Sequence, residues 1–291
     1  MEKTSTILPD DIRTDNSVVK NILMVVPLSR KWAVEMQAKQ IAAMHRFTDV
    51  DIELLVWIDN KEINNDFVVD KFEKHELPFA YTVRNTGNRE PHEIRLFHRR
   101  DRIRDSLTQL QQHIRERGRK YDMMFMVEDD TIIQQDTLHR LLMDYKELTD
   151  QNVKVGFIEG VQVGRHGIRM IGAWRMDDLE NPTKMSTIPL NTKSFFEKID
   201  GGGLYCFITP MELFLAHTFY WTEECFSVDV TYGIELRKKG YTNIIDWTCV
   251  TGHTDQNGNA LYPNENVTVA AYEKQEDGEW KLQPFQKGKI S

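Results

Sequence analysis

Strand-like segments alternate with helix-like segments along the first 163 residues, and this order constrains the fold more than any other feature of the chain. The strand-like segments, mostly short apolar runs, are residues 21–30, 51–60, 80–85, 121–127 and 154–163. Apolar residues at helical spacing mark residues 31–47, 67–77, 91–117 and 136–148, with Asp136 as the expected N-cap of the last helix. This alternation predicts a mostly parallel central α/β sheet with helices on both faces.

Polar residues follow several of the expected strands. Asp59 ends the second strand, Asn85 ends the third, and the fourth runs into Glu128, Asp129 and Asp130. Ligands of such sheets collect beyond the carboxyl ends of the strands. Three adjacent carboxylates beside an apolar core repel one another, so a cation or solvent has to be next to them. Carboxylates at a strand end suit Mg²⁺ or Mn²⁺, and a plain acidic turn is the alternative interpretation.

The second half of the sequence is less regular. Residues 164–200 are polar and weakly periodic, which indicates a flexible or acceptor-facing loop region. A glycine turn, a strand and a helix are expected in 200–217, a helix ending at Gly240 in 226–241, and a strand in 243–253 with His253 just past its end. Two extended runs in 267–285 predict a hairpin. One domain with a C-terminal appendage fits this order.

Charge and composition exclude some classes of protein. The net charge of −8 argues against a polycation built for nucleic acid. Between residues 84 and 120, however, 11 Arg and Lys stand against 5 Asp and Glu, which suggests a confined anionic ligand or else a solvated helix face. The apolar runs are too short to span a bilayer, and the polar N-terminus does not resemble a secretory signal. Cys206, Cys225 and Cys249 match no zinc motif, so we expect free thiols in a cytoplasmic protein.

Three segments resemble one known family in their order along the chain. VEDDTIIQQDTL, from Val127, resembles the Asp-x-Asp segment of GT-A glycosyltransferases, which use a metal-bound nucleotide sugar. Residues 85–88 followed by RRDRIRDSL are similar to the family's Asn-x-Gly turn and Arg-containing helix. Residues 226–253 resemble the segment that supplies a catalytic Asp, an amphipathic helix and a final His. The resemblance implies a GT-A type, Rossmann-like domain at 21–253, divided at 163/164 into a nucleotide-sugar half and an acceptor half. Residues 1–20 would be an arm and 254–291 a tail.

The resemblance also implies roles for individual residues. Asp130, Glu128 and His253 would bind Mn²⁺ or Mg²⁺, and Asp229 would be the general base of an inverting transfer. Val228 stands where many members of the family have a second acid, and Glu-Asp-Asp departs from Asp-x-Asp, so Asp129 could compete for the metal. Contacts to the nucleotide or donor are implied for Pro27, Ser29, Asp59, Asn85, Arg102, Arg104, Asp129, Gly201 and Gly202. Trp174 would stack on the acceptor, although a packing role is the ordinary alternative.

These features together predict a metal-dependent glycosyltransferase. It would move a sugar from a nucleoside-diphosphate sugar, by default a UDP-sugar, to a hydroxyl of a glycan or of a hydroxylated nucleic-acid base. Asp229 would take the hydroxyl proton, and the metal would stabilise the diphosphate leaving group. A retaining reaction stays open. One alternative is a sugar-nucleotide nucleotidyltransferase, but such an enzyme should have a Gly-rich phosphate loop after its first strand, and VVPLSRKW contains no glycine. The other alternative is a non-catalytic nucleotide-sugar-binding module.

Overall fold

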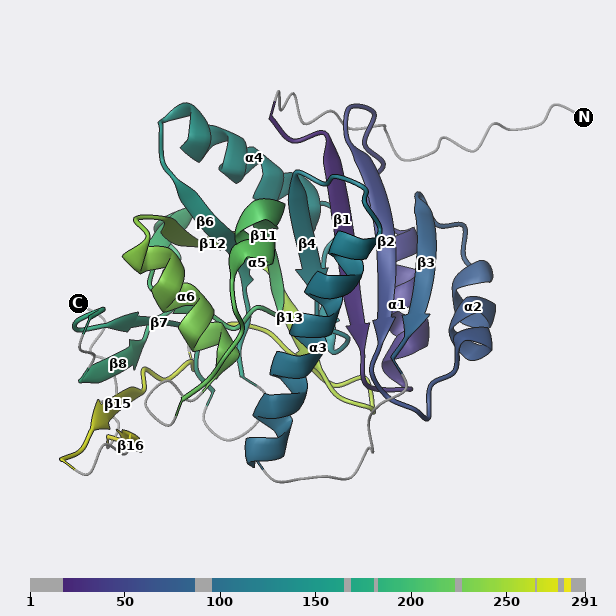
Figure 1. Ribbon diagram of the computed structural model, residues 1–291. Helices are drawn as coiled ribbons and strands as arrows, with labels where there is room; N and C mark the ends of the chain where they lie inside the picture. The colour runs from purple at the N-terminus through teal and green to yellow at the C-terminus, as the bar shows by residue number, and fades with distance from the viewer. Residues whose placement is uncertain are drawn as a thin grey trace, which may run out of the picture.

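The protein is built around a central sheet with helices on both faces. The computed structural model describes residues 18–86, 96–164, 169–180, 183–222, 227–264, 266–276 and 280–283. The eight strands of the central sheet are, in spatial order, β3 (Ala80–Asn85), β2 (Asp51–Ile58), β1 (Asn21–Leu28), β4 (Met123–Val127), β11 (Cys206–Pro210), β6 (Val155–Val161), β12 (Thr242–Val250) and β9 (Phe196–Ile199). Figure 1 shows this sheet in the middle of the molecule.

The central sheet is mostly parallel, as the alternation of strands and helices predicts. Strands β3, β2, β1 and β4 run parallel to one another, and so do β6 and β12. The exceptions are β11, which is antiparallel to both β4 and β6, and the edge strand β9. The result is a mixed α/β, Rossmann-like arrangement in which one antiparallel strand joins two parallel groups.

Two large apolar clusters pack against the central sheet, one on each face. Alternate residues of β1 point to opposite faces, so Ile22 and Met24 belong to one cluster and Leu23 and Val25 to the other. The first cluster is covered by α1 (Ala33–Ala42), α2 (Asn65–Glu73) and α4 (Thr137–Asp150). The second is covered by α3 (Leu96–Glu116), α5 (Met211–Ala216) and α6 (Val228–Lys238), which lie in front of the sheet in Figure 1.

A second, five-stranded sheet corrects the expectation of a loop region at 164–200. It consists of β10 (Gly201–Gly202), β7 (Ala173–Met176), β8 (Lys184–Thr187), β15 (Ala271–Lys274) and β16 (Trp280–Leu282). Strands β15 and β16 form the hairpin expected at 267–285, whereas β7, β8 and β10 are too short for a local periodicity to reveal them. The C-terminal residues pair with each other and, through β15, with β8, so they extend this sheet.

A third sheet of three very short strands was also absent from the sequence-based expectations. It contains β14 (Ala260–Leu261), β13 (Gly252–Thr254) and β5 (Thr131–Ile132). His253 pairs with Thr131 across β13 and β5. The segment that follows the acidic cluster is thereby joined to the segment after β12.

Several local expectations can be compared with the structure. The helix expected at 91–117 is described from Leu96 onward, since 91–95 lie outside the described residues. Asp136 precedes α4, but its side chain makes no capping hydrogen bond, because its carboxylate pairs with Arg140 instead. Cys206 and Cys249 are buried free thiols, and Cys225 lies outside the described residues. In the described part of the chain, no helix is both long enough and apolar enough to cross a membrane.

Candidate functional site

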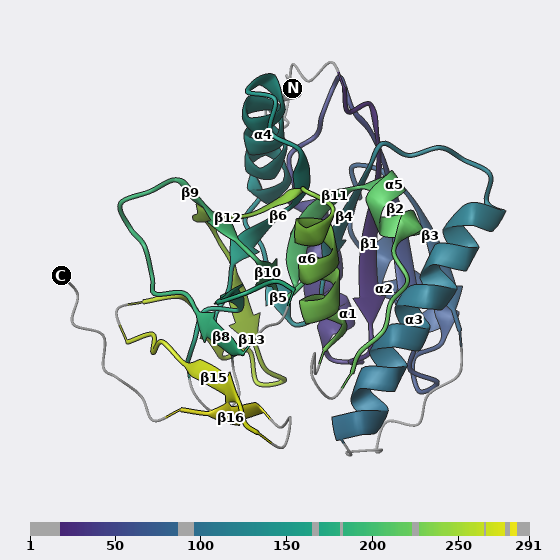
Figure 2. The ribbon, with the colours of Figure 1, turned by 60° about the vertical axis from the view of Figure 1, so that its left-hand side comes forward.

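The carboxyl ends of the parallel strands meet at one edge of the sheet. Leu28, at the end of β1, is level with Ile58 of β2, and Ile58 is level with Asn85 of β3. Because β4 pairs in register with β1, the residues after Val127 leave the sheet at the same edge. In Figure 2 this edge lies at the lower end of β1, near β13 and the first turns of α3 and α6. The structure therefore brings Ser29, Asp59, Asn85 and the acidic cluster to one edge.

Asp129 ties the end of β1 to the end of β4. Its Oδ2 accepts hydrogen bonds from the backbone N–H groups of Ser29 and Arg30, each at 2.7 Å, and from the Ser29 hydroxyl at 3.1 Å. The Arg30 guanidinium pairs with its Oδ1. Burial raises the pKa of Asp129, and Arg30 and the backbone donors oppose that rise. These contacts make Asp129 a link between two strand ends.

Arg30 is the cation beside the acidic cluster. Its Nη2 lies 3.0 Å from Oδ2 of Asp130, while its Nη1 pairs with Asp129. Burial tends to lower the pKa of Arg30, but Asp129, Asp130 and Glu128 outweigh it and raise that pKa. The sequence reasoning did not assign Arg30 to the site. The sequence signal for Arg30 was a basic residue just beyond the end of β1. The three acids follow β4, which ends at the same edge of the sheet.

His253 faces Asp130 from β13. Its Nε2 lies 3.1 Å from Oδ2 of Asp130, and its Nδ1 lies 3.0 Å from the Val163 carbonyl oxygen. A carbonyl oxygen only accepts hydrogen bonds, so Nδ1 carries a proton. Nε2 is then the ring nitrogen turned toward the Asp130 carboxylate. This is the orientation of a metal-binding histidine whose other ring nitrogen is held by a backbone carbonyl.

The spacing of Asp130 and His253 fits an edge of an octahedral metal site. Two neighbouring ligands at about 2.1 Å from an ion are about 3.0 Å apart, and the observed separation is 3.1 Å. Among the described residues, no three His, Cys, Asp or Glu side chains form a metal-holding group. The Asp130–His253 separation is compatible with two ligands of one divalent cation, and such an ion would take its remaining ligands from water or phosphate oxygens.

Glu128 is placed differently from the other two acids. Its backbone N–H donates to the Tyr205 carbonyl oxygen at 2.8 Å, at the point where β4 meets the start of β11. Its side chain is half-buried and lies close enough to Arg30 and Tyr205 to raise the pKa of both. Glu128 thus contributes negative charge to the site.

Asp229 lies in the first turn of α6. Its carboxylate accepts a hydrogen bond from the Val230 N–H at 3.1 Å. Burial raises the pKa of Asp229, with the Ser227 side chain, the local backbone N–H groups and Arg100 acting against that rise. A raised pKa makes a carboxylate a stronger proton acceptor near neutral pH.

Glu159 is a second carboxyl close to Asp229, and the sequence reasoning did not single it out. It lies in β6, between Phe207 of β11 and Ile245 of β12, and is fully buried. Burial raises its pKa well above the ordinary value, and the charge of Asp229 raises it further. The N–H groups of Gly203 and Leu204 partly offset this shift, but neither carboxyl oxygen has a hydrogen bond of normal geometry among the described residues. The sequence feature that could have identified Glu159 is that it is an acidic residue inside the otherwise apolar strand β6.

The glycines at 201 and 202 are required by close packing. A Cβ atom at Gly202 would lie 2.0 Å from each carboxyl oxygen of Glu159, and one at Gly201 would lie 2.6 Å from Nε1 of Trp174. Trp174 is only 7% exposed and packs with Met185 and Val230. This placement favours a packing role for the indole over stacking on an acceptor. It also gives the glycines a structural purpose that does not involve a donor sugar.

The residues expected to contact the nucleotide lie along the β1, β2 and β3 side of the edge. Ser29 is exposed, Pro27 is half-buried within β1, and Asp59 is 9% exposed. The Asn85 amide donates to the Ile63 carbonyl oxygen at 2.7 Å, so this side chain supports the neighbouring loop. Asn60, which was not expected, donates to the Ser29 carbonyl oxygen at 2.8 Å.

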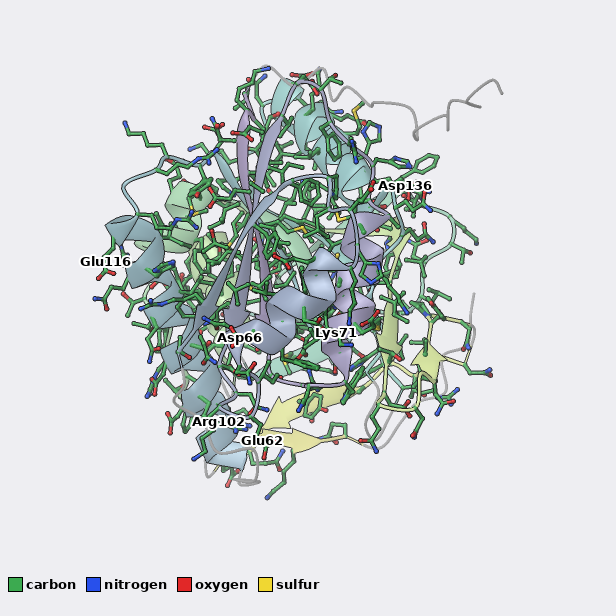
Figure 3. The ribbon with its side chains drawn as sticks, turned by 90° about the vertical axis from the view of Figure 1, so that its right-hand side faces the viewer. Glu62, Asp66, Lys71, Arg102, Glu116 and Asp136 are labelled. Atoms are coloured by element: carbon green, nitrogen blue, oxygen red, sulfur yellow. The ribbon has the colours of Figure 1, made fainter. Side chains whose placement is uncertain are left out.

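The arginines of α3 are not equivalent. Arg104 pairs with Asp101 at 2.9 Å and with Asp105 at 2.8 Å on its own helix. Figure 3 shows Arg102 at the same end of the molecule as Glu62, which follows β2. Arg100 lies over the Trp221 ring, 5.5 Å from its centroid, and near enough to Asp229 for that charge to act on its pKa. Arg100 is therefore the arginine that the structure associates with Asp229.

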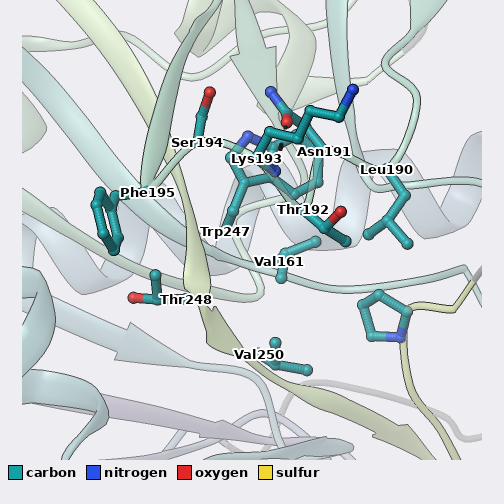
Figure 4. Close-up of a pocket in the computed structure, with 11 residues that line it drawn as sticks. Val161, Leu190, Asn191, Thr192, Lys193, Ser194, Phe195, Trp247, Thr248 and Val250 are labelled. Carbon is teal, nitrogen blue, oxygen red and sulfur yellow. Dashed lines mark hydrogen bonds between the residues drawn. The ribbon is translucent and has the colours of Figure 1, made fainter. Parts of the chain in front are cut away.

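A separate cavity of about 340 Å³ lies beside the carboxyl ends of β6 and β12. It is lined by residues 190–195 together with Val161, Trp247, Thr248, Val250 and Pro263 (Figure 4). Phe195 at this cavity is 77% exposed. The side chain of Val161 is on the same face of β6 as Glu159, two residues away. The cavity combines aromatic surface, hydroxyl groups and one lysine, Lys193.

The fold and this site define a mixed α/β protein with a carboxylate–histidine pair at the carboxyl edge of a Rossmann-like sheet. No protein-family model matches the sequence, and no curated protein matches it. Among solved structures, the crystal structure of A197 from STIV is similar with a TM-score of 0.40 and 12% sequence identity, over 93% of this chain and 98% of that chain. A likeness at this level does not define a fold family.

Proposed function

We propose that the protein is a metal-dependent glycosyltransferase with a GT-A type catalytic domain. It transfers a sugar from a nucleoside-diphosphate sugar, by default a UDP-sugar, to an acceptor hydroxyl. The observation that carries the proposal is the Asp130–His253 pair, with 3.1 Å between Oδ2 and Nε2 and with Nδ1 held by the Val163 carbonyl. Asp130 and His253 would hold Mn²⁺ or Mg²⁺, which when bound would neutralise the diphosphate.

Asp229 is proposed as the general base of an inverting reaction. The acceptor hydroxyl loses its proton to this carboxylate as the hydroxyl oxygen attacks the anomeric carbon, and the bond from that carbon to the diphosphate oxygen breaks. Burial raises the pKa of Asp229, which favours proton uptake, while Arg100 keeps a positive charge near it. The neighbouring carboxyl of Glu159 has its pKa raised well above the ordinary value by burial and by the charge of Asp229.

The acceptor is proposed to be a glycan or a hydroxylated nucleic-acid base, and the cavity beside β6 and β12 favours the glycan. A sugar ring presents apolar faces and hydroxyl groups, which match aromatic side chains beside Thr192 and Ser194. Among the described residues that line the cavity, Lys193 is the single charged one. A nucleic-acid strand would gain more from several cationic contacts to its phosphates.

Calorimetric titration of UDP into the protein, with and without Mn²⁺, tests the proposal. We expect UDP to bind in the presence of Mn²⁺ and to bind far more weakly without it. Asp130→Ala is expected to abolish the metal-dependent part of the binding, because it removes one of the two protein ligands. Asp105→Ala, which removes an exposed carboxylate of α3, is the control and should bind as the wild type does.

A different result would count against the proposal in a specific way. If the folded protein binds neither UDP nor GDP in the presence of Mn²⁺, the acids are a structural cluster neutralised by Arg30, and the chain is not a transferase of this kind. If UDP binds equally well with and without metal, a nucleotide site exists that does not depend on Asp130 and His253.

A further inference from the structure

Arg30 and a metal ion would compete for the same oxygen atom. Oδ2 of Asp130 is 3.0 Å from Nη2 of Arg30 and 3.1 Å from Nε2 of His253. A Mg²⁺ or Mn²⁺ ion bound to this oxygen would lie about 2.1 Å from it, and therefore no more than about 5 Å from the Arg30 nitrogen. Two cations at that distance repel strongly near a protein surface.

The two contacts of the guanidinium differ in strength. The one to Asp129 is supported by the same loop, because the N–H groups of Ser29 and Arg30 also donate to that carboxylate. Asp129 and the main chain of Arg30 therefore form one fixed unit at the end of β1. The contact to Asp130 has no such backbone support and depends on the orientation of the Arg30 side chain, which is 27% exposed.

We propose that Arg30 makes the binding of metal and diphosphate mutually dependent. Without an anion, the guanidinium holds Asp130 and weakens metal binding there. A diphosphate offers Arg30 new acceptor oxygens in bidentate geometry and also neutralises the ion, so each ligand strengthens the other. The coupling is reciprocal, because the same factor must describe the effect of metal on diphosphate affinity. This inference rests on the proposed function, since it uses the Asp130–His253 metal site.

Free Mn²⁺ measured by electron paramagnetic resonance tests the inference without any activity assay. The protein is titrated with Mn²⁺ alone and then in the presence of UDP or GDP, with protein-free titrations as the baseline. In the wild type we expect weak Mn²⁺ binding that the nucleotide tightens at least about tenfold. Arg30→Gln should bind Mn²⁺ alone about tenfold more tightly than the wild type, and the nucleotide should tighten it less.

Two further variants separate the role of Arg30 from general effects of charge and folding. Lys31→Gln removes the neighbouring positive charge, whose Nζ lies 5.0 Å from the centroid of the Phe67 ring, and should behave as the wild type does. Arg30→Lys keeps the positive charge but has no planar guanidinium to contact Asp129 and Asp130 through separate nitrogens. Its Mn²⁺ affinity should therefore fall between those of the wild type and Arg30→Gln. It also provides a folded variant if Arg30→Gln is too unstable, as circular dichroism would show.

Two outcomes would overturn the inference, and they can be told apart. If the Arg30 variants bind Mn²⁺ no more tightly than the wild type while nucleotide still tightens it, the metal site stands and Arg30 does not couple the ligands. If no variant binds Mn²⁺, with or without nucleotide, the metal site of the proposed function falls, and the coupling falls with it.

Discussion

Glu128, Asp129 and Asp130 are adjacent in the chain, yet their carboxyl groups have different surroundings. Asp129 accepts backbone hydrogen bonds from the loop after β1, and Asp130 faces His253 and Arg30. The Glu128 side chain is half-buried near Tyr205. One arginine spans Asp129 and Asp130, so their repulsion is offset before any ligand binds. Asp129, the central acid, stands where the Asp-x-Asp pattern allows any residue, and it is the acid that links the ends of β1 and β4.

Glu159 gives a prediction of pH-dependent stability. Its pKa in the folded protein is raised above the ordinary value of 4.5 by burial, so the folded state keeps a proton that the unfolded state loses above that pH. This carboxyl therefore lowers stability progressively as the pH rises from 4.5 toward the folded pKa. Glu159→Gln should raise the free energy of unfolding at pH 8 by about 1–3 kcal/mol, and the gain should vanish near pH 4.

Denaturant unfolding of the wild type and Glu159→Gln at several pH values measures this effect. Glu62→Gln, at an exposed position, is the control and should leave the pH profile unchanged. A constant difference between the wild type and Glu159→Gln across the pH range would show that Glu159 does not hold an extra proton in the folded state. The comparison also cancels the contribution of Asp144, whose pKa is raised to about 8 by burial and by Asp246.

At the scale of elements, α6 is positioned by its contact with β10. A Cβ atom at Gly233 would lie 2.6 Å from the Asp200 carbonyl oxygen and 2.7 Å from the Cα atom of Gly201. These are backbone atoms, so a side chain at position 233 has no room. Asp229 lies four residues earlier, on the same side of the helix. The close contact therefore also places the proposed base.

Gly233→Ala is expected to destabilise the protein although alanine is the better helix former. The overpacked contact should lower the free energy of unfolding by about 1–3 kcal/mol, against about 1 kcal/mol gained from helix propensity. Thermal or urea unfolding measures the net change. Lys238→Ala, at an exposed position of α6, should change stability little. A more stable Gly233→Ala would mean that α6 is free to move away from β10.

At the scale of the whole molecule, the C-terminal strands complete the five-stranded sheet. Ala270 is fully buried. Its carbonyl oxygen accepts a hydrogen bond from the Thr187 N–H at 2.8 Å, and its own N–H donates to the Thr187 hydroxyl at 2.8 Å. Tyr272 packs against the cluster that contains Trp174 and Met185. This second sheet reaches the central site through β10, which lies against Glu159 and α6.

Deletion of residues 266–291 is therefore expected to weaken the whole protein. It would expose the Trp174 cluster and leave β8 paired with β7 alone, lowering the free energy of unfolding by about 2 kcal/mol or more. Lys184→Ala, which removes only the exposed Lys184–Glu273 pair at 3.4 Å, should have a small effect. Calorimetric melting compares the two, and an unchanged melting temperature after the deletion would show that these strands are dispensable.

Much of the central fold was predictable from the sequence because its signals are local. Continuous apolar runs and helical spacing indicated β1, β2, β4, β6 and the helices between them, and the polar residues after the strands indicated the edge where they meet. The hairpin expected at 267–285 is formed by β15 and β16, whereas β7, β8 and β10 of the second sheet and the strands of the third sheet were missed. Strands of two to four residues carry too little pattern, and their pairing with distant segments decides that they form.

The sequence by itself determined the layered α/β order and the candidate acids, since both follow from spacing and from residue type. Only the tertiary structure decided which acid meets which partner. His253 and Asp130 are 123 positions apart, and Arg30 and Asp129 are 99 apart. Glu159 comes close to Asp229 only because β10 and α6 pack over β6. Side-chain contacts at such separations depend on how sheets and helices pack, and no local pattern in the chain encodes them.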